Sequence, residues 1–332
     1  MSTEQLLQKG FENNSIKEDF FNLKQQKENK DNDLGKLRDL TSTIAKYQKT
    51  ENPELPIDIK TCRLDMEEYS ANQIFKPEEV EGTKETIRQL EEKFLTQVNS
   101  ENLEEKVQQE INGEKFELLT ATTLYKFLKD DFIVVRSARY DDVDNGVDTI
   151  IFDKHTGNIV CTLDEGGSYF GAYAERKKMK TLKKNQDGGA RIKYGLILAE
   201  NSEGKKYIKG NAVKNIPIFD LLLGYEKVEE HLSEISNDIS QISDFEKILF
   251  VYFIKNINNQ ISEMQHLDLN IPPKIRQTAN NFRDKIIQLY PNIFFEDKNY
   301  ISKQKGVLKP DYYLNRQLIT NDKDRDGFRE KS

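Results

Sequence analysis

The sequence has few of the residues that build metal clusters, disulfide frameworks or membrane spans. Its 332 residues include two cysteines, Cys62 and Cys161, which are far apart and match neither a zinc-site spacing nor a disulfide pattern. Three histidines are equally scattered, so a Cys/His metal cluster is excluded. The longest apolar run, Ile248 to Ile254, is far shorter than the roughly 20 residues of a membrane-spanning helix. We therefore expect no membrane partner.

Net charge and the N-terminal sequence exclude further classes of protein. The net charge is -7, from 50 Lys+Arg against 57 Asp+Glu, which excludes a globally basic nucleic-acid-binding protein but leaves room for a local basic patch. The first residues, Met1 to Gln5, contain no basic segment followed by an apolar one, so no secretory signal is predicted. We expect a cytoplasmic protein.

Composition divides the chain into four segments. Residues 1–110 are acidic and rich in Gln and Asn, which predicts a helical, partly flexible extension. Residues 111–224 form the predicted core, 225–295 a helical C-terminal segment, and 296–332 a loose charged tail. Ser15 to Glu18 and Ser243 to Glu246 have the capping-box pattern that starts a helix.

The core segment alternates helical and strand patterns. Its order is a helix, three strands, a helix and a strand, with a fifth strand starting near Ile216. The predicted helices are 114–129 and 174–184, and the predicted strands are 132–135, 147–152, 159–163 and 192–198. The sequence thus predicts an α/β fold in which a small mixed sheet is flanked by helices.

A hairpin in this core brings two acids together. If its turn centres on Thr156, Phe152 pairs with Val160, Ile150 with Thr162, and Asp148 with Asp164. Such cross-strand partners share a face of the sheet, where two like charges are destabilising unless a cation or a proton neutralises them. Mg²⁺ is the natural occupant because it prefers oxygen ligands. The alternative is a hairpin end whose acids point apart into solvent, or a pairing shifted by one residue.

Three motifs stand in order along about residues 113–198: Gly113 to Glu117 with Leu124, then Phe132 to Val135, then Asp144-Asn-Gly-Val-Asp148. Together they resemble the PD-(D/E)xK nuclease superfamily, the restriction-endonuclease-like enzymes. It implies an αβββαβ core, with Glu117 as the acid on the helix and Asp148 as the first ligand of Mg²⁺ or Mn²⁺.

The third element of the family pattern, an acid followed two residues later by lysine, is not matched. Asp164 is the best substitute for the second metal-binding acid and Glu165 is its competitor, but Gly166 and Gly167 stand where the lysine would be. Some members of the superfamily supply the lysine from the next helix, which here offers Lys177, Lys178 and Lys180. The sequence leaves open which of the three could act.

A basic stretch follows the hairpin. Residues 175–193 have a local charge of +6, and cations beside an acidic metal site suit an enzyme that cuts a polyanion. The alternative is a solvated lysine-rich helix that has no binding role. The predicted nucleic-acid-binding residues are Arg176, Lys177, Lys183, Lys184, Arg191 and Lys193.

Two functions follow as expectations. The first is a magnesium-dependent nuclease acting on DNA or RNA, in which a lysine stabilises charge on the phosphoryl oxygens. The second is a degenerate relative that binds nucleic acid or protein without cutting. In either case the helical flanks could bind a protein partner or a second copy of the chain.

Overall fold

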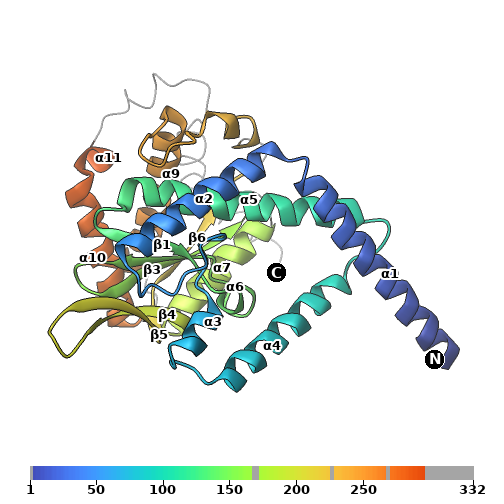
Figure 1. Cartoon of the computed structure of the whole chain (residues 1–332). Helices are drawn as coiled ribbons and strands as arrows, with labels where there is room; N and C mark the ends of the chain where they lie inside the picture. The colour runs from blue at the N-terminus through green and yellow to red at the C-terminus, as the bar shows by residue number, and fades with distance from the viewer. Residues whose placement is uncertain (1–2, 167–171, 225–227, 267–269, 296–332) are drawn as a thin grey trace.

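The structure is a computed structural model that describes residues 3–166, 172–224, 228–266 and 270–295 (Figure 1). The predicted charged tail at 296–332 lies outside these ranges. Within them the chain is mixed α/β, as the sequence predicts: many helices surround small sheets. None of the described helices is both long enough and apolar enough to cross a membrane.

Four strands form the main sheet in the order β1-β2-β3-β6. They are β1 (Phe132–Arg136), β2 (Thr149–Asp153), β3 (Asn158–Gly166) and β6 (Ile218–Leu222). β2 is antiparallel to both β1 and β3, whereas β6 runs parallel to β3, so the sheet is mixed. Every residue of β1, β2 and β6 is buried, which requires cover on both faces.

The predicted hairpin exists, with one correction to its register. Ile150 lies opposite Thr162 as predicted, but Phe152 lies opposite Ile159 and not Val160. A β-bulge next to Phe152 inserts one extra residue into β3, and this shifts the pairing nearer the turn by one position. The open end of the hairpin keeps the predicted register.

The predicted strand at 192–198 is a strand, but it does not join the main sheet. It belongs to β4 (Ala190–Glu200), which pairs only with β5 (Lys206–Ile216) in a separate two-stranded sheet. The last strand of the main sheet is instead β6. β5 has no counterpart in the prediction, because its polar, lysine-rich sequence lacks the apolar alternation of a strand.

Helices cover the main sheet. α5 (Leu103–Leu128) packs against β1, β2 and β3, while α7 (Ala172–Gln186) and α9 (Asp244–His266) pack against β6, and α10 (Pro273–Leu289) packs against β3. In Figure 1, α2 and α5 cross above the sheet, and the β4–β5 hairpin extends below it.

The N-terminal helices pack onto this core. They are α1 (Thr3–Glu28), α2 (Asn32–Glu51), α3 (Met66–Ala71) and α4 (Pro77–Leu95), and three short elements complete the fold: α6 (Arg139–Val143), the 3-10 helix η1 (Leu232–Glu234) and α11 (Pro291–Phe295). α2 packs along α5, and one continuous apolar cluster extends from Phe20 of α1 to Ile286 of α10.

The two capping-box predictions have opposite outcomes. α1 is already helical at Thr3 and continues through Ser15, so the predicted start there is wrong. At α9 the box is present: the backbone N–H of Glu246 donates to Oγ of Ser243 over 3.2 Å, and that of Ser243 donates to Oε2 of Glu246 over 2.7 Å.

Candidate metal centre

Asp148 lies at the end of the main sheet, immediately before β2. Its backbone continues the ladder, because its N–H donates to the carbonyl of Leu163 and its carbonyl accepts from the N–H of Ser137, both over 2.8 Å. Its carboxylate turns toward β3, where Oδ2 accepts from the backbone N–H of Glu165 over 2.6 Å. The residue is therefore buried, and its side chain is held by one hydrogen bond from β3.

Glu117 reaches the same place from α5. Its Oε2 accepts from Nη2 of Arg136, the last residue of β1, over 2.5 Å and from Nη2 of Arg63 over 2.7 Å. Burial acts to raise the pKa of Glu117, but these two guanidinium groups outweigh it and hold the pKa below its usual value. Glu117 therefore carries a negative charge at neutral pH.

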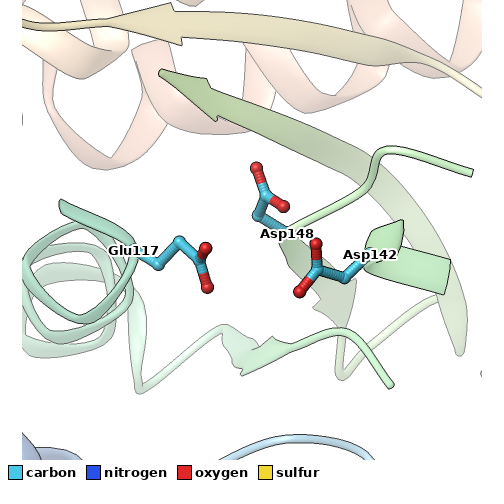
Figure 2. A group of neighbouring side chains, drawn as sticks. All are labelled: Glu117, Asp142 and Asp148. Carbon is cyan, nitrogen blue, oxygen red and sulfur yellow. The ribbon is translucent and has the colours of Figure 1, made fainter. Parts of the chain in front are cut away.

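Asp142 completes a group of three acids from the short helix α6. One oxygen of each of Glu117, Asp142 and Asp148 lies within 4.8 Å of the others, a spacing at which a single metal ion could bind all three. In Figure 2 the carboxylates of Glu117 from α5 and Asp142 from α6 point toward each other, and that of Asp148, just before β2, lies beside them and is turned away. Carboxylate oxygens are the ligands that Mg²⁺ prefers.

The charge of Asp142 is partly balanced by arginines. Its Oδ2 lies 3.1 Å from Nη2 of Arg63 and 2.9 Å from Nη1 of Arg139. Arg63 thus bridges Glu117 and Asp142 and places one positive charge beside both.

Glu165 is a fourth buried acid beside this group. Glu165 is only 8% exposed, and neither of its carboxylate oxygens accepts a hydrogen bond from a described residue. Burial raises the pKa of Glu165 to about 7, although nearby Asp148 and Thr149 offset part of that rise. A buried carboxylate without a partner is costly, so this site is short of a proton or a cation.

Asp148 is a second buried acid that has no cation beside it among the described residues. Burial is the main cause that raises its pKa well above the usual value, and the neighbouring charges of Glu165 and Glu117 raise it further. The arginines contact Glu117 and Asp142, while Asp148 and Glu165 have no cationic side chain within ion-pair distance among the described residues. A divalent cation held by Glu117, Asp142 and Asp148 would balance the charge of Asp148, so the residues present fit a metal ion.

Asp164 projects from the opposite face of the sheet. The register places Arg136, Thr149 and Leu163 in one row, and Arg136 bonds to Glu117 of α5, so this row faces α5. Side chains alternate along a strand, so Glu165 shares that face and Asp164 does not.

The partner of Asp164 is Lys177 of α7. Nζ of Lys177 lies 2.6 Å from Oδ1 of Asp164 and also donates to the backbone carbonyl of Glu165. The register predicted from the sequence brings Asp148 and Asp164 to opposing positions, but the two carboxylates have different partners. The acids that share a site with Asp148 are Glu117 and Asp142.

The three candidate lysines are separated by the structure. Lys177 is buried against β3, as described above, and Lys178 forms an ion pair of 3.0 Å with Glu263 of α9. Lys180 is exposed and forms no ion pair with a described residue, and a Cβ built on Gly146 would lie 3.7 Å from its Nζ. Lys180 is therefore close to the loop that carries Asp148 and free of competing carboxylates.

The predicted nucleic-acid-binding residues do not form one exposed stripe. Lys177 is buried, Lys184 donates to the carbonyls of Asn145 and Gly146, and Lys193 lies 5.2 to 5.7 Å from the centres of three aromatic rings. Lys183 is exposed but pairs with Asp187 over 2.8 Å. The other two predicted residues, Arg176 and Arg191, are exposed.

Several residues of the site are missing from the prediction. Asp142 lies in α6, which is only five residues long and therefore has no periodic helical pattern in the sequence. Arg136 was detectable in principle, since a charged residue at the end of an otherwise apolar strand needs a carboxylate partner when it is buried. Arg63 is distant in sequence and was not detectable.

No protein-family model, curated protein or solved structure matches this chain.

Proposed function

We propose that the chain is a magnesium-dependent nuclease with a core like that of the PD-(D/E)xK superfamily. The observation that carries this proposal is the meeting of Glu117, Asp142 and Asp148 at one end of the sheet, beside the unpartnered carboxylate of Glu165. An acidic cluster alone is common, but a buried acid that lacks any partner favours a missing cation.

The order of elements supports the likeness to this core. α5, β1, β2, β3, α7 and β6 follow one another as helix, three strands, helix and strand, with the β4–β5 hairpin inserted before β6. α5 and α7 cover opposite faces of the sheet, since Glu117 bonds to the row of Arg136 and Lys177 to Asp164. These features agree with an αβββαβ core whose last strand is β6.

Each side chain has a role in this proposal. Glu117, Asp142 and Asp148 would hold Mg²⁺ or Mn²⁺, with Glu165 adjacent. A cation bound there would supply Lewis-acid activation of a phosphodiester and of an attacking water. Lys180 is placed to reach a phosphate bound at the Gly146 loop and to stabilise the charge that grows on its oxygens. Lys177 fixes β3 through Asp164.

A cutting assay tests the proposal. Single- and double-stranded DNA and RNA are incubated with the protein in Mg²⁺, in Mn²⁺ or in EDTA. Metal-dependent cutting that falls at least a hundredfold in Asp148→Ala and Asp142→Asn supports the nuclease. Asp144→Asn is the matched control, because Asp144 is an exposed aspartate of the same loop outside the group of three acids.

A non-cleaving binding protein is the second candidate. It is favoured by the lysines: Lys177 pairs with Asp164, and no lysine forms an ion pair with Glu117, Asp142 or Asp148 within the described part of the chain. Salt-sensitive binding of nucleic acid that survives Asp148→Ala, with no cutting in any metal, would support this candidate and reject the nuclease.

A further inference from the structure

A cavity of about 270 Å³ lies where the β2–β3 turn, the β4–β5 hairpin and α10 meet. Its floor is apolar and its rim is polar. Ile159, Leu196, Ile216 and Phe282 are buried residues of the floor, each at most 5% exposed. The volume is close to the lower limit of about 300 Å³ typical of small-molecule sites.

The rim has cations that no described residue neutralises through an ion pair. Lys214 of β5 and Lys274 in the first turn of α10 both line the cavity, and both are exposed. Arg191, also exposed, lies directly opposite Lys214 in the register of the β4–β5 hairpin, an arrangement that is destabilising for like charges. None of these three residues forms an ion pair within the part of the chain that the structure describes.

Two further features of α10 favour an anion. The first turn of α10 contains no acidic residue, so Lys274 adds positive charge to the positive end of the helix dipole. Lys274, Thr278 and Asn281 follow one another at spacings of four and three and line the cavity from one face of the helix. The side chains of Thr278 and Asn281 have no hydrogen-bond partner among the described residues.

Among the described residues, Asp153 is the one acid that lines the cavity, and one of its carboxylate oxygens already accepts two backbone hydrogen bonds. Oδ1 of Asp153 accepts from the backbone N–H groups of His155 and Thr156, over 2.7 and 3.1 Å. Asp153 therefore caps the β2–β3 turn, and its charge is partly satisfied by these two N–H groups.

We propose that this cavity binds a nucleoside phosphate, with the phosphate between Lys214 and Lys274 and the base against the apolar floor. An anion with an apolar ring fits both halves of the cavity, whereas inorganic phosphate would leave the floor empty. Thr278 and Asn281 supply hydrogen bonds to the ligand. The nucleotide could be free or be the phosphorylated end of a nucleic-acid chain, since both present the same group.

This site is separate from the metal centre. Asp148 precedes β2, whereas Asp153 at the far end of β2 lines the cavity, and five residues of strand span roughly 16 Å. Binding in the cavity needs none of the acids around Asp148, so it does not depend on nuclease activity.

Calorimetry in EDTA tests the proposal on the full chain. The probes are AMP, UMP, adenosine, inorganic phosphate, and a pentanucleotide with or without a 5′-phosphate. We expect AMP or UMP to bind at least tenfold more tightly than adenosine or inorganic phosphate. Lys214→Gln and Lys274→Gln should each weaken binding about tenfold, the effect of losing one charge-assisted hydrogen bond.

Control variants make the outcomes distinct. Lys205→Gln removes an exposed lysine outside the cavity and should leave binding unchanged, as should Asp148→Ala. A 5′-phosphorylated pentanucleotide that binds at least as tightly as AMP identifies a chain end as the ligand, and binding of AMP alone identifies a free nucleotide. No saturable binding of either, or equal binding by the wild type and the two cavity variants, would overturn the proposal.

Discussion

The two faces of the main sheet each contain buried acids, but only one face supplies a lysine for them. On the α7 face, Lys177 lies 2.6 Å from Asp164, and its charge also lowers the pKa of Asp220 on β6 relative to burial alone. On the α5 face, arginines contact Glu117 and Asp142, and two further acids, Asp148 and Glu165, are without a cation among the described residues.

The comparison separates a structural ion pair from a candidate binding site. A buried carboxylate with its own cation needs nothing more from solution, whereas one without a cation takes up a proton or a metal ion. Burial raises the pKa of Glu165 to about 7 and that of Asp220 to about 6, and the charge of Lys177 opposes the rise in both cases. Hence the α5 face is where an added cation should stabilise the fold.

Removing the lysine of the α7 face should have the largest effect. Lys177→Met leaves Asp164 buried without its cation, and loss of one partner of a buried pair costs about 3–5 kcal/mol. The double variant Lys177→Met with Asp164→Asn should recover much of this loss, because no charge is then stranded. Urea unfolding of the three proteins measures these differences.

An exposed lysine of the same helix is the control. Lys180→Met should change the free energy of unfolding by less than about 0.5 kcal/mol. A single Lys177→Met variant that loses less than 1 kcal/mol would show that the α7 face does not depend on this pair, and the contrast between the two faces would fail.

The pH dependence of stability should show that Glu165, on the α5 face, is buried without a cation. The pKa of Glu165 rises from 4.5 to about 7 on folding, so the folded state binds the extra proton and this stabilisation is present below pH 4.5. It is lost as the pH rises through 7, by on the order of 3 kcal/mol. Thermal unfolding between pH 5 and 8 measures it, and the loss should shrink in saturating Mg²⁺.

Neutralising Glu165 should raise the stability of the metal-free protein and reduce the stabilisation that Mg²⁺ gives. Glu165→Gln removes a buried charge, so at pH 7.5 without metal the variant should be about 1 kcal/mol more stable than the wild type. Its melting temperature should rise less with Mg²⁺ than that of the wild type. Glu203→Gln, at an exposed position of the β4–β5 turn, should match the wild type in both measurements. An unchanged Mg²⁺ response in Glu165→Gln would remove Glu165 from the metal centre.

Local sequence patterns predicted the elements of the core but not all of their partners. The apolar strands at 132–135, 147–152 and 159–163 are predictable, and so is the hairpin formed by the last two, because turn chemistry and alternation are local signals. The bulge beside Phe152 and the separation of β4 from the main sheet were not, because they depend on contacts with residues far along the chain. Strand pairing is set by tertiary packing, which a single sequence does not display.

The site was predictable to the same degree. The sequence predicts Glu117 and Asp148 as site residues, and in the structure their carboxylates lie within 4.8 Å of each other. Asp142 comes from a helix too short to leave a periodic signal, and Arg63 enters from a loop before α3. The alternation of a strand decides between Asp164 and Glu165: it places Glu165 toward α5 and Asp164 toward α7.

The smallest expected effect concerns Gly146, where the two faces meet. This glycine has φ +57° in the loop between Asp142 and Asp148, and a Cβ there would lie 3.1 Å from Nζ of Lys184 and 3.5 Å from Oδ2 of Asp164. Gly146→Ala should cost about 1 kcal/mol from the left-handed backbone, since the lysine end can move aside. Gly113→Ala provides the contrast, because Gly113 lies within α5 with nothing within 4 Å of its Cβ position, and alanine there should stabilise by about 0.5–1 kcal/mol. Urea unfolding gives both signs, and Mg²⁺ titration of Gly146→Ala shows whether the loop geometry matters to the three acids. Equal signs for the two variants would mean that the Gly146 loop tolerates a side chain and does not constrain the metal centre.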